Sequence, residues 1–362
     1  MKQHVIEDFR KQFPAAQNYT YLNTASSGLM SAKLSSWRAA HDQEFVLGGS
    51  VFRDDHKQFL GTIRNSVAHF FDAKLNEVAL IPNFSFALNT LLEGIPKGKK
   101  VLLLDRDYPS INWAFEKRDF EICFATIDST IEQNIEQAVS RHRPDIFAFS
   151  IVQYLNGIKI DLDFLKQLKA YHPELLLIAD GTQYLGTEAF SFQDSAIDIL
   201  GASAYKWMLS GYGNGVFMVK EGAQKDIKPR TIGFNSAEAI FGNRDTISFM
   251  KHFEPGHQDT LNYGSLGKSL EFFNEVGILK IASYLSELTT KAKASFIEMG
   301  LLDESSTKRE SHSTIFNLQG NEVAFQKLTA AKILCSQRGN GIRVSFHLYN
   351  NEEDIHKLLD CF

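Results

Sequence analysis

Short apolar runs alternate with amphipathic segments through the first two thirds of the chain. Almost wholly apolar runs predict strands at 99–105, 120–127, 145–152 and 175–180. Between them, 131–142 and 163–173 carry apolar side chains at helical spacing. Strands that are apolar on both faces and separated by helices are typical of a parallel sheet covered on both sides. The pattern therefore predicts a large α/β domain with a mainly parallel sheet sandwiched by helices.

The pattern changes beyond about residue 245. Two long helices, broken near 275–277, are predicted over 265–300, and the rest of the chain follows the order strand, helix, strand, helix. These elements predict a smaller C-terminal α+β domain. We expect residues 21–244 to form the large domain, and residues 1–20 and 245–362 to form the small one.

Composition and charge narrow the class of protein. The 362 residues are 44% hydrophobic and 22% charged, as in an ordinary globular protein with a sizeable core. The net charge is -5 and no basic stripe is present, which argues against a nucleic-acid partner. No apolar run approaches membrane-spanning length, and the charged N-terminus lacks the apolar core of a signal peptide. We therefore expect a cytoplasmic protein without membrane association.

The cysteines and histidines follow no metal-binding or disulfide pattern. Cys123, Cys335 and Cys361 are scattered and form no CxxC pair, which excludes a disulfide framework. Neither an HExxH motif nor a cluster of Cys and His is present. The sequence therefore predicts no metal site.

Polar or aromatic residues stand beside several apolar runs. The turn 83–85 precedes an apolar helix, where exposed amides and the Ser85 hydroxyl suit a phosphate, although Ser85 alone would be an ordinary N-cap. Tyr108 follows the strand at 99–105, and its ring could stack on a flat ligand or simply fill the core. Asp180 ends the strand at 175–180, where an acid either contacts a ligand or forms a turn.

A lysine follows a further apolar run. Lys206 lies between Tyr205 and Trp207 with no carboxylate close to it in the sequence. A lysine whose stem covers a sheet edge is the ordinary interpretation of such a position. Its place after the phosphate-like turn, the aromatic residue and the acid favours another. Pyridoxal phosphate needs a phosphate cradle, a stacking face, an acid for its pyridine nitrogen and an amine for its aldehyde.

Seven segments in order make the resemblance to a family specific. The chain resembles the class V aminotransferase family, the cysteine desulfurase- and kynureninase-like group of pyridoxal-phosphate enzymes with the aspartate aminotransferase fold, fold type I. The segments that carry this resemblance are FPAAQNYTYLNTASSG, PNFSFALNT, DYPS, VQYLNG, ADGTQ, SAYKW and IRVSFHLYNNEEDI. They extend over essentially the whole chain.

The resemblance implies roles for the residues that match the family's cofactor site. Lys206 would form a Schiff base with the cofactor, and Asp180 would pair with the pyridine nitrogen. Gln183 would donate a hydrogen bond to the ring oxygen, and Tyr108 would stack on the ring. The phosphate would be bound by Phe84, Ser85, Ser203 and Tyr205.

The resemblance also implies a substrate side and a dimer. Arg343 would bind the substrate carboxylate as a bidentate fork, a geometry that guanidinium suits. Ser27, within the segment 23–28, and Tyr154 would lie near the substrate. The family fold implies a homodimer whose partner supplies a phosphate contact. Gly256 and His257 stand at that position, where many relatives have Gly-Thr.

The chain departs from the family in three places. Tyr205 replaces the histidine that commonly precedes the lysine, and VQYLNG, with Tyr154, is closer to kynureninase-like and epimerase-like members. Desulfurases carry a nucleophilic cysteine on a mobile loop well before the carboxylate-binding arginine. Cys335 lies eight residues before Arg343 in a predicted strand and turn, so we interpret it as a buried apolar residue.

These features lead us to expect an aminotransferase that acts on a small amino acid and a 2-oxo acid through Lys206. A lyase or epimerase of the same family, kynureninase-like or cysteine/selenocysteine lyase-like, shares its first steps and remains open. A non-catalytic relative is disfavoured because Lys206 and Asp180 are both present. Arg343 indicates only a carboxylate, and three further arginines could not be ranked as distal contacts: Arg53, Arg230 and Arg244.

Overall fold

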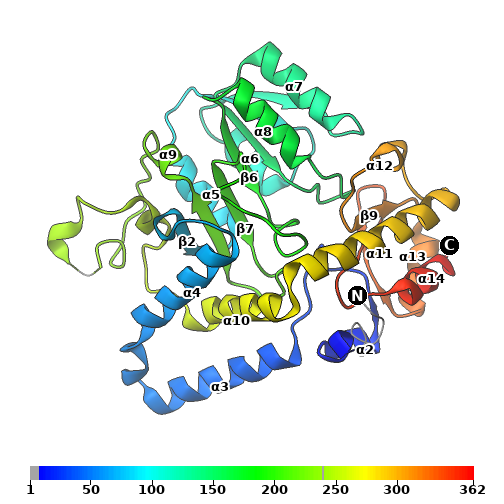
Figure 1. Ribbon diagram of the computed structural model, residues 1–362, viewed down its shortest axis with the longest axis horizontal. Coiled ribbons are helices and arrows are strands. Elements are labelled where there is room, and N and C mark those ends of the chain that lie inside the picture. Colours follow the sequence, from blue (N-terminus) through cyan, green and yellow to red (C-terminus); the bar gives the residue numbers. More distant parts are fainter. Residues whose placement is uncertain (1–7, 239) are drawn as a thin grey trace.

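A seven-stranded sheet forms the centre of the molecule (Figure 1). The computed structural model describes residues 8–238 and 240–362. Its strands are β2 (Val78–Ile81), β3 (Lys100–Leu104), β4 (Glu121–Ala125), β5 (Ile146–Ser150), β6 (Leu176–Asp180), β7 (Ile199–Ser203) and β8 (Gly215–Val219). The order is β2-β8-β7-β6-β5-β3-β4, and only the pairs that involve β8 are antiparallel. The predicted mainly parallel α/β sheet is confirmed.

Alternation along the strands divides the core of this sheet into two layers. One layer contains Val101 and Leu103 with helices α5 (Phe84–Leu92) and α6 (Pro109–Glu116). The other contains the intervening residues, such as Leu102, packed against helices on the opposite face. Those helices are α4 (His56–Phe70), α7 (Ile131–His142), α8 (Leu162–Tyr171) and α10 (Thr260–Val276). Because both faces are covered, successive apolar residues are buried, which explains the unbroken apolar runs.

A second, three-stranded antiparallel sheet lies near the C-terminus. Its order is β11-β12-β9, with β9 (Ile315–Leu318), β11 (Ser336–Arg338) and β12 (Gly341–Ser345). Helices α11 (Ile278–Glu298), α12 (Glu304–Lys308), α13 (Glu322–Ala330) and α14 (Glu352–Leu359) accompany it. Gly277, at φ 90°, ends α10 directly before α11 begins, which is the predicted break.

The N-terminal segment joins the two sheets. Strand β1 (Thr20–Tyr21) pairs in parallel with β10 (Ile333–Leu334), and Asn23 forms a bridge with Ser345. The remaining elements are α2 (Pro14–Asn18), α3 (Ala32–Gly48), α9 (Glu221–Gln224) and the 3₁₀ turns η1 (Val51–Arg53), η2 (Leu75–Glu77), η3 (Phe241–Asn243) and η4 (Phe249–Phe253). Among the described helices, none is both long and apolar enough to cross a membrane. The pairings of β1 and Asn23 place the segment after β1 between the two sheets, where β6 and β7 end.

Candidate active site

Lys206 lies in the turn that follows β7 and is almost completely buried. Its side chain is 5% exposed, and its Nζ is 5.5 Å from the ring centre of Tyr108 and 5.6 Å from that of Tyr205. The ammonium group makes no hydrogen bond or ion pair with any residue that the structure describes. A buried amine without such a contact is costly for stability, so its position requires another explanation.

Asp180 ends β6, which pairs with β7, and faces the same space as Lys206. Its carboxylate accepts a hydrogen bond from the Thr182 N–H at 2.8 Å and is 5% exposed. Burial raises the pKa of Asp180 and lowers the pKa of Lys206, while the charge of each residue opposes the shift of the other. The lowered pKa increases the fraction of Lys206 that is an unprotonated amine, which is the nucleophilic form.

The N-terminus of α5 lies beside the end of β7. The Phe84 N–H donates to Ser203 Oγ at 3.0 Å, and Asn83 caps the helix by accepting from the Phe86 N–H at 2.9 Å. The Ser85 hydroxyl donates to Ser110 Oγ at 2.8 Å. The structure thus brings together Phe84, Ser85 and Ser203, which are far apart in the sequence. Helix N-terminal amides and hydroxyls in this arrangement suit an anion.

Tyr108 is positioned by an acid that sequence reasoning missed. Asp107 accepts from the Tyr108 N–H at 2.6 Å and from the Ser150 N–H at 2.8 Å, and so ties Tyr108 to the end of β5. Asp107 is 4% exposed, and burial raises its pKa. The Tyr154 ring lies 5.2 Å from the Tyr108 ring at an angle of 70°. An acid after the strand, one residue before the aromatic, was the available indication.

Arg343, on β12, reaches the same space from the smaller sheet. Its Nη1 donates to the Tyr154 carbonyl at 2.7 Å and its Nη2 to Ser26 Oγ at 2.6 Å, while Nε is buried without a partner. It forms no ion pair within the described residues, and burial lowers its pKa to about 10. Ser27, predicted near the substrate, makes no hydrogen bond with Arg343 among the described residues, and its hydroxyl is 3.4 Å from the Gly28 carbonyl. The serine at the guanidinium is Ser26.

Gln183 and Tyr205 have contacts within the protein. Gln183 donates through Nε2 to the Ala25 carbonyl at 3.0 Å and accepts from Trp207 Nε1 at 2.7 Å. The Tyr205 ring stacks on Tyr212 with centres 4.6 Å apart, and burial raises the pKa of Tyr205 to about 12. Gln183 therefore joins the N-terminal segment to the turn of Lys206.

Gly256 and His257 are not brought to Lys206 within this chain. Both are exposed, and the His257 ring stacks on Phe234 with centres 5.3 Å apart. Its Nε2 is 3.3 Å from Arg53 Nη2. Neither residue makes a hydrogen bond with another predicted site residue in the described part of the chain.

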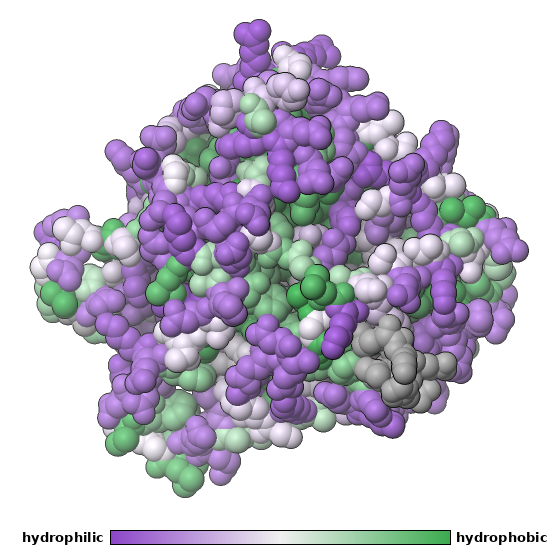
Figure 2. Space-filling model, in the orientation of Figure 1, coloured by the Kyte–Doolittle hydropathy of each residue, from purple (hydrophilic) through white to green (hydrophobic). Residues whose placement is uncertain are grey.

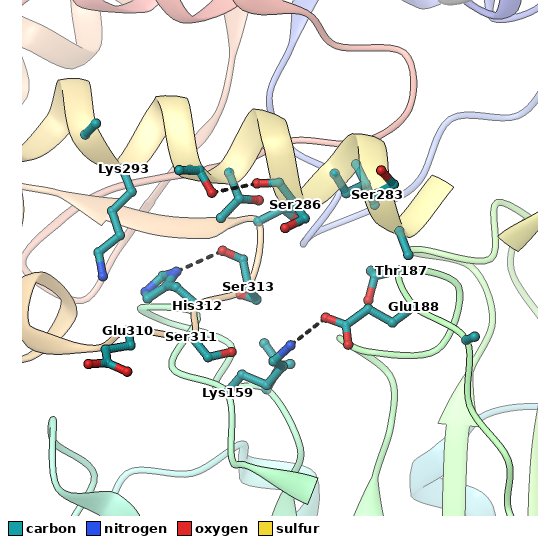
Figure 3. Close-up of a pocket in the computed structure, with 18 of the residues that line it drawn as sticks. Lys159, Thr187, Glu188, Ser283, Ser286, Lys293, Glu310, Ser311, His312 and Ser313 are labelled. Carbon is teal, nitrogen blue, oxygen red and sulfur yellow. Dashed lines mark hydrogen bonds and ion pairs between the residues drawn. The ribbon is translucent and has the colours of Figure 1, made fainter. Parts of the chain in front are cut away.

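A groove of about 980 Å³ lies between α11 and the loops 187–189 and 310–314 (Figure 3). Three of its four charged side chains have partners inside the protein, and the fourth is Glu310. Lys159 pairs with Glu188 at 2.5 Å, and Lys293 donates to the Arg309 carbonyl. None of the predicted site residues lines this groove. The groups around Lys206, by contrast, keep hydrogen-bonding capacity in a buried place, which marks that space as the candidate active site.

The residues around Lys206 fit pyridoxal phosphate. Lys206 presents an amine with a lowered pKa, Asp180 presents a buried carboxylate, and the α5 N-terminus with Ser203 presents donors for a phosphate. The ring of Tyr108 borders the space between them. These are the four contacts that this cofactor needs.

Comparisons with known proteins agree with this fit. The family model "Aminotransferase class-V" matches residues 45–358. The "uncharacterized aminotransferase YcbU" of Bacillus subtilis (strain 168) is 21% identical over 366 residues, 99% of this chain and 97% of the relative. A "probable cysteine desulfurase" of Ureaplasma parvum serovar 3 is 25% identical over 333 residues, 83% of this chain and 81% of the relative.

Solved structures share the fold across the chain. The cystine C–S lyase C-DES, in complex with its product cysteine persulfide, has a TM-score of 0.86 at 18% identity and covers 97% of this chain and 99% of its own. The cysteine desulfurase of Thermococcus onnurineus NA1 has a TM-score of 0.83 at 18% identity, covering 98% and 96%. With the family model matched over most of its length, the chain belongs to the class V aminotransferase family and is a pyridoxal-phosphate-dependent enzyme of fold type I.

Proposed function

We propose that the protein is an aminotransferase that moves an amino group between a small amino acid and a 2-oxo acid. The observation that carries this proposal is the buried amine of Lys206, held between Asp180 and Tyr108 and facing Arg343, which forms no ion pair with a described residue. Transfer of an amino group requires an amine that moves the Cα proton, an acid that supports the cofactor ring and a guanidinium that binds the substrate carboxylate. Lys206, Asp180 and Arg343 supply these three groups.

The chain's own residues divide the work between the two sides of the site. When bound, pyridoxal phosphate supplies an aldehyde that binds amines and an electron-withdrawing ring that stabilises negative charge at Cα. Lys206 would hold this aldehyde through its Nζ, and its free amine would take the Cα proton of a bound amino acid and give it back. Asp180 would hold the proton on the pyridine nitrogen through its negative charge. Burial makes that charge effective because little water screens it.

Arg343 orients the substrate. Its guanidinium is fixed by the Tyr154 carbonyl and Ser26 Oγ, which leaves the second N–H of each Nη for a carboxylate. A substrate held there has its amine and Cα directed towards Lys206, across the narrow space bordered by Tyr108. Holding the Cα next to the amine that takes its proton supplies much of the rate.

The positions of the cysteines favour transamination over desulfuration. Cys335 lies between β10 and β11, half-buried against the core, and burial raises its pKa to about 12. Cys123 lies on β4 and donates to the Val101 carbonyl, and Cys361 is buried near the C-terminus. A desulfurase needs an accessible thiolate at the substrate sulfur, and none of the three thiols meets that need.

A lyase or epimerase that removes the same Cα proton is the second candidate. The observation that favours it is the fold similarity to C-DES, which is described as a cystine C–S lyase. The two candidates separate at the fate of the amino group, which a transaminase keeps on the cofactor and a lyase releases. A non-catalytic role fits the site less well because a purely binding protein has no need of the buried Lys206.

The decisive experiment follows the bound cofactor. The purified holoenzyme should be yellow, and a panel of amino acids without a 2-oxo acid should bleach the visible band of the aldehyde form in one half-reaction. Addition of a 2-oxo acid should restore the band and release the new amino acid. Release of pyruvate, ammonia or a persulfide without bleaching would establish lyase chemistry instead. Protein that stays colourless after incubation with pyridoxal phosphate would contradict both.

We further propose that two copies of the chain form the enzyme. Apolar side chains are exposed around the tip of α3 and on the segment after β8, with Leu47 85% and Phe241 93% exposed. Figure 2 shows green patches at these two places, at the lower left and far left of the view. Lys57–Glu238 and Arg53–His257 contacts connect the two regions. A second copy covering this surface would explain its exposure, and sedimentation velocity should give the mass of a dimer.

A further inference from the structure

The hairpin β11–β12 carries a second arginine, Arg338, on the same side of the sheet as Arg343. Arg343 pairs with Ser336 on β11 and with Asn317 on β9, while Arg338 pairs with Gly341. Side chains of a strand alternate between its faces, so Arg338, two residues from Ser336, points to the same face as Arg343. Diagonal neighbours of this kind have Cα atoms about 7–8 Å apart, well within reach of two long side chains.

The contacts of neighbouring residues identify the two faces of this sheet. Ile342 and Val344 are buried in the core, and Gln337 donates to Glu322 of α13 at 2.8 Å, so these residues occupy the face that α13 covers. On the opposite face, Ser345 Oγ accepts from the Ala25 N–H at 2.9 Å. Arg338 therefore points away from α13, towards the N-terminal segment and the active site.

The tip of the hairpin approaches the loop that holds Arg343. A Cβ on Gly339 would lie 3.9 Å from Leu155 Cδ2, and the neighbouring Tyr154 accepts a hydrogen bond from Arg343 through its carbonyl. The positive charge of Arg338 acts on its surroundings here: it lowers the pKa values of Arg343 and of Lys206 after the larger effect of burial. The Arg338 side chain is exposed and forms no ion pair with a described residue.

We propose that Arg338 makes the enzyme selective for amino acids with a second carboxylate, of the aspartate or glutamate type. Arg343 would bind the α-carboxylate, and Arg338, on the same face and nearer the solvent, would bind the side-chain carboxylate. This assignment rests on the proposed function of the site. Two guanidinium groups beside a lysine repel one another unless an anion lies between them, and a substrate with two carboxylates neutralises both. The flat carboxylate also matches the guanidinium fork better than other side-chain groups do.

The first test measures binding without reaction. Succinate, glutarate and butyrate lack an amine, so their binding to the holoenzyme can be followed by calorimetry whatever the reaction is. We expect one of the two dicarboxylates to bind the wild-type enzyme at least about 10-fold more tightly than butyrate, as one hydrogen bond between charged groups provides. Whether succinate or glutarate binds more tightly indicates the distance between the two guanidinium groups.

A matched pair of variants isolates Arg338 from net charge. Arg338→Gln should reduce the preference for the dicarboxylate over butyrate to less than about 3-fold, because the contact to the second carboxylate is lost. Lys327→Gln removes one positive charge from α13, which covers the other face of the same sheet, and should leave the preference unchanged. Equal binding of all three acids by the wild type, or an equal loss of preference in both variants, would overturn the assignment.

The second test uses reacting amino acids. In the half-reaction, aspartate or glutamate should exceed alanine in kcat/KM, and Arg338→Gln should lower that ratio by about 10- to 100-fold. If alanine reacts as well as the acidic amino acids, the proposed selectivity of Arg338 is wrong, but the proposed aminotransferase function is supported. If no amino acid bleaches the holoenzyme, the aminotransferase proposal fails. The binding of succinate, glutarate and butyrate then still tests whether Arg338 binds a second carboxylate.

Discussion

Gly28 lies directly against the backbone of Lys206. The Gly28 N–H donates to the Tyr205 carbonyl at 2.9 Å, and a Cβ on Gly28 would come within 2.0 Å of the Lys206 carbonyl oxygen. The N-terminal segment thus packs on the turn that carries the reactive lysine, at a separation that only a residue without a side chain allows. This contact fixes where the Lys206 side chain begins.

Gly28→Ala should therefore displace either the N-terminal segment or the turn of Lys206. We expect a loss of about 1–3 kcal/mol in unfolding free energy from overpacking, together with weaker cofactor binding. Gly61→Ala on α4 is the control, because a Cβ there meets nothing within 4 Å, and alanine in a helix should be neutral or stabilising by up to about 1 kcal/mol. Chemical denaturation and cofactor titration measure both effects. A Gly28→Ala enzyme as stable as the Gly61→Ala enzyme would show that the contact is not restrictive.

Lys206→Ala should remove the covalent attachment of the cofactor. The visible band of the lysine-bound form should disappear, and turnover should fall by at least about 1000-fold, because the general acid–base group is lost as well. Lys220→Ala is the matched control: burial also lowers the pKa of Lys220, but its Nζ lies over Phe192, 5.5 Å from the ring centre. Spectra of both variants after reconstitution and reduction with borohydride check this. A retained band in Lys206→Ala would place the attachment elsewhere.

Asp180→Asn should keep the cofactor bound but slow the reaction. The amide oxygen can still accept from the Thr182 N–H, as the carboxylate does at 2.8 Å, so the local structure should persist. The negative charge that holds a proton on the pyridine nitrogen is lost, and we expect a decrease of about 100-fold or more in kcat. Single-turnover kinetics measure this rate, and a thermal melt or a crystal structure of the variant checks that the fold is intact. An unchanged rate would exclude Asp180 from the ring contact.

Arg343→Lys should weaken substrate binding although it keeps the charge. A lysine cannot hold the Tyr154 carbonyl and Ser26 Oγ while it presents a fork to the carboxylate, so we expect an increase of about 100-fold in the Kd of the amino acid. Ser26→Ala removes only one of the orienting contacts and should cost about 10-fold at most. Spectral titration gives both constants. Equal effects of the two substitutions would argue that Arg343 does not meet the substrate directly.

His347 should make the stability of the protein depend on pH. Its Nε2 donates to the Trp207 carbonyl at 2.8 Å and its Nδ1 accepts from the Leu348 N–H at 2.6 Å, which is the neutral form, and burial lowers its pKa to about 4. Between the unfolded pKa near 6.5 and the folded value, only the unfolded chain binds the proton. The stabilisation is complete above pH 6.5 and decreases as pH falls towards 4, with a slope of up to about 1.4 kcal/mol per pH unit.

His347→Gln, which keeps one donor and one acceptor, isolates this contribution. The variant should be less stable at pH 7 but should lose less stability than the wild type between pH 7 and pH 5. Urea unfolding at the two pH values gives the comparison. Parallel losses in both proteins would show that His347 takes up its proton in the folded state.

The sequence by itself predicted several strands of the large sheet and proposed Lys206 and Asp180 for the centre of the site. Apolar runs buried on both faces identified β3, β5 and β6, and Gly277 marked the break between α10 and α11. Lys206 and Asp180 were predicted because a phosphate-like turn, an aromatic residue, an acid and a lysine follow one another as pyridoxal phosphate requires, and because the chain resembles a family with such a site. Local patterns determine such features because strand burial and helix ends depend on adjacent residues.

The tertiary structure alone decided which side chains meet across these elements. Ser26 rather than Ser27 hydrogen-bonds with Arg343, Asp107 accepts from the Ser150 N–H at the end of β5, and Arg338 shares a face with Arg343. Each of these contacts depends on strand register or on packing between segments more than 40 residues apart or, for Arg338, on a turn that sets the pairing. A shift of one residue in any of them would exchange the faces of a strand. The chain therefore encodes its chemistry in residue types, whereas the substrate side of the site arises only when the N-terminal segment and both sheets come together.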